Sequence, residues 1–286
     1  MKKDNINSKK SELRYPVLES DAFSPDQVAK RVATTGVKKV GLPFVSTLAL
    51  GILGGAFISM GVLYEQVIRV AAADGSTGLS FLAPIMYSMG YMIAFISGAE
   101  IFTTNNLAVM GLASKKIKTW SLIKNWTYVL FANAIGAIMI AGMLFYSGKL
   151  ADEEGALILQ IVTASSERIE YKNIEIFFQA TFANFLICGG AWVAMAGKTI
   201  TDKVLALVLP ISAVSALGFQ HCAGNMMPMF LSLMTIPNIE VNGVAESVTF
   251  LNVVENLTVV AAGNILGGAV LVGLIYYLIY IKKPWQ

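Results

Sequence analysis

The sequence is poor in charged residues. Lys and Arg number 21 and Asp and Glu 18 in 286 residues, so 14% of the chain is charged, against about 25% in soluble domains. Fourteen of these charges lie in residues 1–40, and the rest of the chain carries too few to solvate the surface of a globule. Hydrophobic residues make up 56% of the chain. This excludes a disordered protein and places the body of the chain in a bilayer.

Cysteine and histidine are also scarce. Two cysteines, Cys188 and Cys222, lie in apolar surroundings and exclude a disulfide framework. One histidine, His221, leaves no ligand set for zinc, so we expect no metal and no cofactor. One histidine, one deep glutamate and two cysteines form no catalytic constellation, so an enzyme is not expected. Residues 1–40 are polar and lack the apolar core of a signal peptide.

Six apolar stretches are long enough to cross a membrane, which takes roughly 20 residues each. The chain divides into a cytoplasmic segment with an amphipathic helix (1–40), a six-span pore domain (41–281) and a short tail (282–286). The helix is expected after Ser24-Pro25-Asp26-Gln27, a capping-box sequence, with Val28, Val32 and Val37 against the inner membrane surface; an ordinary cytosolic helix is the alternative. The predicted spans are residues 41–64, 79–110, 121–146, 174–196, 204–234 and 248–281.

Basic residues sort by membrane side. With both termini inside, 17 of the 21 Lys and Arg residues are on the inner side and four, Arg69, Lys149, Arg168 and Lys172, are outside. The positive-inside rule therefore predicts a multi-pass protein of the cell inner (cytoplasmic) membrane with cytoplasmic N and C termini. Because the basic residues follow the membrane, they indicate contact with lipid headgroups rather than with nucleic acid.

The two halves of the pore domain resemble each other. We interpret residues 41–147 and 174–281 as two three-span repeats, and because three is odd, the second copy enters the membrane inverted. An inverted repeat favours a substrate path near the midplane. The matching features are Gly-Gly-Ala at 54–56 and 189–191, Asn125 and Asn133 against Asn256 and Asn264, and residues 98–105 against 218–225.

Glycine and asparagine interrupt spans two and five at these last segments. A helix break inside a bilayer is tolerated within protein or along a cavity, and its half-helices present free N–H groups that favour an anion or a polar solute. Glu100 and His221 lie deep in the two breaks, and buried ionisable residues in membranes are functional candidates. We expect Glu100 to pair with backbone amides or with the N-terminal helix, and His221 to exchange a proton or a hydrogen bond.

These motifs resemble the formate/nitrite transporter family. The resemblance covers residues 24–283 and implies an all-α membrane protein: an aquaporin-like protomer with helices 2 and 5 broken, assembled as a homopentamer with one pore per protomer. The motifs that carry it are 99–103 with Asn105-Asn106, 218–222 with Asn225-Met226, 124–126 with Asn133, and 263–268.

The resemblance also implies which residues line the path. Carried over, the family's pattern places pore and transport residues at His221, Thr103, Asn184, Gln220 and Arg168, with Lys172 as the alternative outer cation. The implied constriction consists of Ile101, Phe102, Tyr91, Ile187 and Val214. The residues implied to support the two helix breaks are Glu100, Asn105 and Asn225. The chain departs from the family at Gln220, where a glutamate is usual, and at Tyr91 and Val214, where formate channels have Leu and Phe. The missing carboxylate no longer favours a cationic histidine.

The resulting hypothesis is a channel or transporter for small monovalent anions of weak acids, with protons as possible co-substrates. Formate is the first expectation and nitrite the second, with hydrosulfide, lactate and acetate as further possibilities. Arg168 or Lys172 would concentrate the anion, and His221 would hydrogen-bond or protonate it between two apolar constrictions. The alternative is an aquaporin-type water or small-solute channel, although Asn-Pro-Ala is missing at both breaks. A non-transporting scaffold would not require buried polar breaks.

Overall fold

The computed structural model describes residues 22–73, 75–238 and 246–282. Five of its helices are long and apolar enough to cross a membrane. They are α2 (Phe44–Ala71), α3 (Thr77–Ser97), α6 (Thr119–Tyr146), α8 (Asn173–Ala196), and α11 (Phe250–Asn264), which continues through the π-helical η4 (Ile265–Leu274) into α12 (Ile275–Tyr280). The described chain is helical throughout, as the spans predicted. The predicted ends at 1–21 and 283–286 lie outside the described residues.

The remaining predicted span, 204–234, is divided into two shorter helices. α9 (Ile200–Ala216) and α10 (Cys222–Thr235) are separated by residues 217–221. The second span is divided in the same way, because α3 is followed by α4 (Phe102–Asn105), η1 (Asn106–Ala108) and α5 (Val109–Ala113). Gly98 and Gly218 turn the chain at the two breaks with φ of 81° and 69°, a conformation that glycine adopts without strain. Helices two and five are therefore both broken, as predicted.

An asparagine holds the start of each half-helix. Asn133 on α6 accepts the Phe102 N–H at 2.9 Å, and Asn264 at the end of α11 accepts the Cys222 N–H at 3.1 Å. Each side-chain amide also donates into the first helix of its own repeat, Asn133 to Gly51 O at 2.7 Å and Asn264 to Ala180 O at 2.9 Å. The chain therefore satisfies the first N–H of each half-helix itself, so these two are not among the free N–H groups expected at the breaks.

These hydrogen bonds also correct the register of the repeat. They make Gly51 of α2 equivalent to Ala180 of α8, whereas the Gly-Gly-Ala match pairs residue 54 with residue 189, six positions further along. Packing agrees with the new register. Gly61 faces Gly90 of α3, and its new partner Gly190 faces Pro210 of α9, while a Cβ on Gly189 would meet nothing within 4 Å. The Gly-Gly-Ala match was coincidental, since such triplets are common in packed membrane helices.

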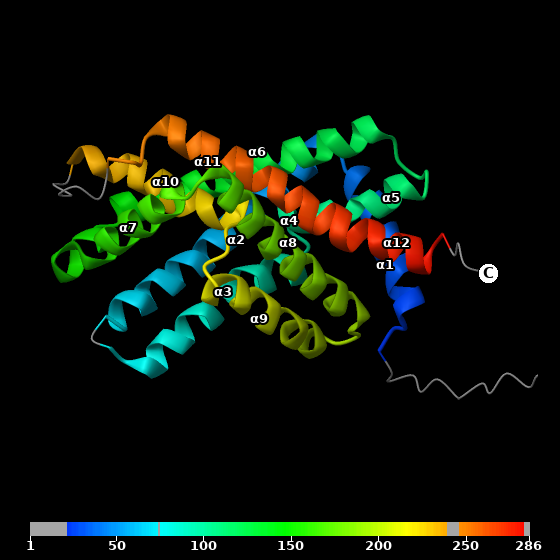
Figure 1. Cartoon of the computed structure of the whole chain (residues 1–286), viewed down its shortest axis with the longest axis horizontal. Coiled ribbons are helices and arrows are strands. Elements are labelled where there is room, and N and C mark those ends of the chain that lie inside the picture. Colours follow the sequence, from blue (N-terminus) through cyan, green and yellow to red (C-terminus); the bar gives the residue numbers. More distant parts are fainter. Residues whose placement is uncertain (1–21, 74, 239–245, 283–286) are drawn as a thin grey trace, which may run out of the picture.

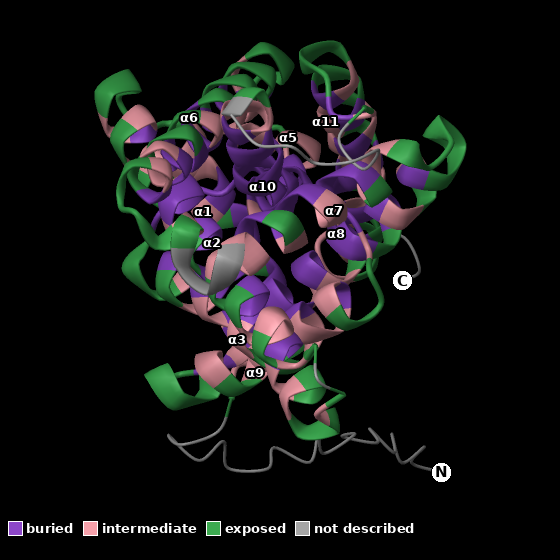
Figure 2. Ribbon diagram, turned by 90° about the vertical axis from the view of Figure 1, so that its left-hand side faces the viewer, coloured by how far each residue is buried: buried purple, intermediate pink, exposed green. Residues whose placement is uncertain are grey.

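α1 (Pro25–Val40) begins with the predicted capping box, in which Gln27 accepts the Ser24 N–H at 2.9 Å. Its apolar side is covered by protein rather than by lipid: Val28 and Val32 are buried in a cluster with Leu107, Val109 and other residues of the first break. α1 and α12 lie at one end of the molecule, and α7 (Ala156–Glu170) lies at the other (Figure 1). Burial is greatest in the middle, where α10 lies (Figure 2). Two short 3₁₀ segments, η2 (Lys149–Gly155) and η3 (Ile236–Asn238), complete the described elements.

Candidate functional site

His221 lies at the centre of the molecule and caps α10. Its Nδ1 accepts the Gly224 N–H at 3.1 Å, and 1% of the residue is exposed. A backbone N–H can only donate, so Nδ1 is an acceptor and the proton of the neutral ring is on Nε2. Gly224 is required here, because a Cβ would collide with the histidine ring. The position of His221 within the second break agrees with its place in the sequence.

Two tyrosines of α3 flank the histidine. The Tyr87 hydroxyl is hydrogen-bonded to His221 Nε2, and the Tyr91 hydroxyl lies 3.2 Å from Nδ1 and 3.0 Å from the Thr103 hydroxyl. Both rings meet the imidazole edge to face, with centroids 5.8 and 5.5 Å apart. Sequence reasoning placed Tyr91 in the constriction but missed Tyr87. The available signal was the spacing of four residues, which puts both hydroxyls on one face of a helix.

The five residues predicted to form the constriction are gathered by the fold. They are buried in one hydrophobic cluster, and none of them is more than 2% exposed. Thr103 is also buried, with 0% exposure, so a solute reaches it only when side chains move. Asn184 was expected to face the pore. Its amide nitrogen donates to Asn264 O at 2.6 Å and to Thr103 O at 3.2 Å. The five residues predicted to form the constriction are Tyr91, Ile101, Phe102, Ile187 and Val214.

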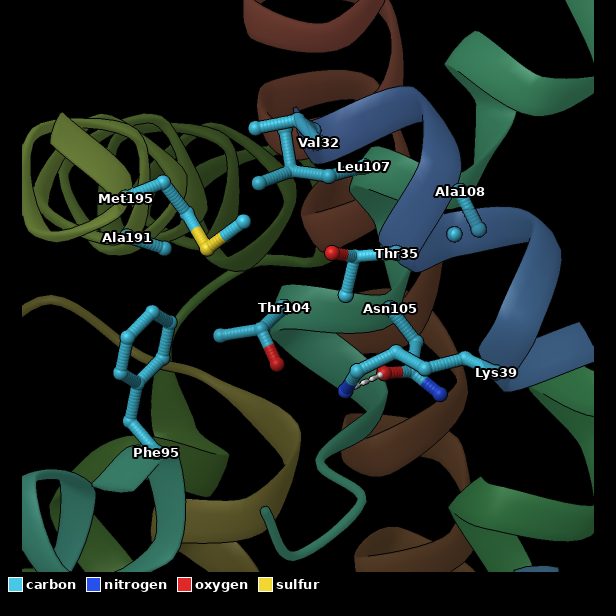
Figure 3. Close-up of a pocket in the computed structure, with 11 residues that line it drawn as sticks. Val32, Thr35, Lys39, Phe95, Thr104, Asn105, Leu107, Ala108, Ala191 and Met195 are labelled. Carbon is cyan, nitrogen blue, oxygen red and sulfur yellow. Dashed lines mark hydrogen bonds between the residues drawn. The ribbon is translucent and has the colours of Figure 1, made fainter. Parts of the chain in front are cut away.

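The first break is held by a charged cluster. Glu100 forms an ion pair with Lys39 of α1 at 3.1 Å and accepts a hydrogen bond from Asn105 at 2.5 Å. Asn105 also accepts from Lys39 Nζ at 2.8 Å and donates to Asn125 at 3.1 Å. Figure 3 shows Lys39 and Asn105 pointing toward each other beside a cavity of about 50 Å³ at the α1 end. Glu100 thus pairs with the N-terminal helix, one of its two expected partners.

The second break is held by a neutral version of the same cluster. Asn225 donates to Gln220 Oε1 at 2.8 Å and to Asn256 at 3.0 Å, and Gln220 Nε2 donates to Arg168 O at 3.1 Å. Asn256 donates to Arg168 O, also at 3.1 Å, just as Asn125 donates to Lys39 O in the first break at 3.4 Å. The backbone of Arg168 is therefore the structural counterpart of that of Lys39.

Arg168 borders a cavity of about 260 Å³ at the α7 end, together with Arg69. Removal from water lowers the pKa of the Arg168 guanidinium, and the nearby Glu65 carboxylate raises it. Glu65 is buried, pairs with Arg69 at 2.7 Å and accepts a hydrogen bond from Ser215 at the end of α9. Sequence reasoning missed this cluster. Lys172 is exposed and borders a separate cavity of about 500 Å³.

Comparisons with known proteins agree with this geometry. A family model described as formate/nitrite transporter matches residues 26–278. The chain is 32% identical to an uncharacterized transporter, YrhG, of Bacillus subtilis over 91% of this chain and 94% of the relative. It is 30% identical to the formate channel FocA of Escherichia coli K12 over 92% and 96%. A solved structure described as a pentameric formate channel with formate bound superposes with a TM-score of 0.76 at 29% identity, over 84% of this chain and 98% of that one.

Proposed function

The chain belongs to the formate/nitrite transporter family, and on that premise we propose that it carries small monovalent anions of weak acids across the cytoplasmic membrane. Formate is the first candidate because FocA is a formate channel and a similar solved structure is described with formate bound. Nitrite is the second, and hydrosulfide, lactate and acetate are further candidates. A transporter family also argues against an enzyme.

The path runs from the cavity beside Arg168 at the α7 end to the cavity beside Lys39 at the α1 end, and it crosses the buried centre around His221. Arg168 raises the anion concentration at one mouth, because the other arginine there, Arg69, is paired with Glu65. An anion leaving this mouth loses water in the apolar cluster, which costs several kcal/mol unless hydrogen bonds replace the hydration shell. Thr103 and His221 are the buried polar groups placed to supply them. The apolar ring formed by Ile101, Phe102, Ile187 and Val214 excludes hydrated cations.

The observation that carries this proposal is the fixed orientation of His221. Gly224 occupies Nδ1, so Nε2–H, which is hydrogen-bonded to Tyr87 in this structure, is the ring N–H that can donate to an anion. A second proton would have to be added at Nδ1, which would break the helix cap and place a positive charge at the N-terminus of α10, where the helix dipole disfavours it. We therefore propose His221 as a neutral hydrogen-bond donor, and proton donation to the anion as the competing role of the same residue.

The family and the similar pentameric structure support a homopentamer with one pore per protomer. Large apolar side chains such as Phe131, Leu209 and Leu251 are exposed on the helices, and they suit either lipid or a neighbouring protomer. We place residues 1–40 and 282–286 in the cytoplasm. α1 and α12 lie at the same end, which agrees with both termini being on one side.

The test is uptake of formate and nitrite into proteoliposomes at two pH values, for wild type and His221→Asn. Asparagine is a good N-cap residue and keeps a side-chain acceptor for Gly224, so the fold of α10 should survive. We expect uptake to fall at least tenfold with an unchanged pH profile. A changed profile would favour proton donation instead, and uptake equal to wild type would exclude both roles. Osmotic swelling of the same vesicles measures water flux and separates an aquaporin-type channel from an anion channel.

A further inference from the structure

Both ring nitrogens of His221 are occupied by groups of the chain itself. Nδ1 accepts from Gly224 and lies 3.2 Å from the Tyr91 hydroxyl, and Nε2 is hydrogen-bonded to the Tyr87 hydroxyl. Because the neutral ring carries its proton on Nε2, the Tyr87 oxygen is the acceptor in that bond. The position that a transported anion needs, the one facing Nε2–H, is therefore filled by Tyr87.

We infer that Tyr87 is a substrate stand-in and a selectivity residue: an entering anion replaces its oxygen at His221 Nε2 and then accepts a second hydrogen bond from the displaced Tyr87 hydroxyl. This rests on the proposed function and names the class of anion. Two donors side by side suit a planar anion with two acceptor oxygens, as in a carboxylate or nitrite, since paired charge-assisted bonds are short and strong. Hydrosulfide offers one sulfur atom, and sulfur is the weaker acceptor.

Tyr91 supplies the matched contrast. It lies one turn from Tyr87 on α3, is also buried and also touches the imidazole. Its hydroxyl, however, is shared between Thr103 Oγ1 and Nδ1, the nitrogen that cannot donate. The Tyr91 hydroxyl therefore links the two breaks and positions the ring, and its loss affects all anions alike. The same Tyr→Phe change at the two positions separates selectivity from positioning.

The experiment measures formate, nitrite and hydrosulfide uptake into proteoliposomes holding full-length wild type, Tyr87→Phe or Tyr91→Phe. We expect Tyr87→Phe to lower the formate-to-hydrosulfide and nitrite-to-hydrosulfide uptake ratios about tenfold or more, the effect of one hydrogen bond to a charged group. Tyr91→Phe should leave both ratios within about twofold. Unchanged ratios in Tyr87→Phe, or equal falls in both variants, would overturn the inference.

A second measurement needs no variant. In wild type, nitrite should halve formate uptake at a concentration about tenfold or more below that at which hydrosulfide does so; equal concentrations would contradict the role of Tyr87. Failure of the proposed function looks different, because the wild-type protein would then transport none of the three anions. If formate enters but the selectivity predictions fail, only the inference about Tyr87 is wrong.

Discussion

The two helix breaks are built on one plan and differ in charge. Both use three asparagines, one on the half-helix that follows the break and two on the third helix of the repeat, and both begin at a glycine with positive φ. At the first break the plan carries Glu100, paired with Lys39, and the apolar Ile101. At the second the equivalent positions hold the neutral Gln220 and His221, and Gln220 donates to a carbonyl instead of pairing with a cation.

Because of this difference, the first break has a structural role and the second offers a group that can bind a solute. The Glu100 carboxylate at the first break is neutralised by Lys39 of α1, which also donates to Asn105 and so holds α1 against the break. Among the described residues, the second break has no such ion pair, and its histidine, His221, meets two tyrosine hydroxyls. The asparagine side chains of each break satisfy its buried polar groups by hydrogen bonds. The second break can therefore carry a histidine in place of an apolar residue without loss of the fold.

The largest effect should come from removing the shared asparagine of the first break. Asn133→Leu keeps the number and branching of the side-chain heavy atoms but leaves the buried Phe102 N–H without its acceptor and removes two donated bonds. We expect a cost of about 3 kcal/mol, the sum of one unsatisfied group and the lost bonds. Asn264→Leu is the matched variant. It loses one donated bond to Ala180, so it should cost about 1 kcal/mol less.

Thermal unfolding in detergent measures both variants, and circular dichroism before heating shows whether each has folded. Asn133→Leu should melt at the lower temperature. An Asn264→Leu protein that melts first would show that the two frameworks are not equivalent in the way that their hydrogen bonds indicate.

A smaller effect is expected at the charge that distinguishes the breaks. Glu100→Gln still accepts from Asn105 but leaves the Lys39 ammonium without its anion, and the Lys39 side chain is 24% exposed. Partial access to water limits the cost to about 1–2 kcal/mol. Adding Lys39→Met should restore part of this loss, and a double-mutant cycle of unfolding free energies measures the coupling. Lys38→Met, an exposed neighbour, is the control and should stay within about 0.5 kcal/mol of wild type. Additive effects of Lys39 and Glu100 would contradict the pairing.

What the sequence predicted well was local. Hydropathy located the spans, and Gly98 and Gly218 marked both breaks because positive φ restricts the residue type. A lone histidine at a break was a strong signal because burial in a membrane is costly. The partners of these residues were harder to predict. Tyr87 reads as an ordinary apolar-face residue until α3 is placed beside the second break, and its hydrogen bond to His221 spans 134 positions.

The register of the repeat failed for a related reason. Gly-Gly-Ala triplets match by composition, whereas the true equivalence of Gly51 and Ala180 is set by backbone carbonyls that meet Asn133 and Asn264. Backbone atoms carry no residue signature, so this pairing is invisible in a sequence. The burial of Val28 and Val32 against protein was missed similarly, because an amphipathic helix shows the same pattern whether lipid or protein covers its apolar face.

The smallest effect concerns the mouth beside the second break. Arg168 occupies the place of Lys39 but has no carboxylate from Gln220 to pair with, so its charge can act on solutes in the cavity that it shares with Arg69. Arg168→Gln should lower formate uptake several-fold at low ionic strength and less at high ionic strength, because salt screens attraction over about 10 Å at 0.1 M. Lys172→Gln, an exposed charge beside another cavity, should change uptake less than twofold. If Lys172→Gln had the larger effect, the outer cation would be Lys172, and the equivalence of Arg168 and Lys39 would be confined to their backbones.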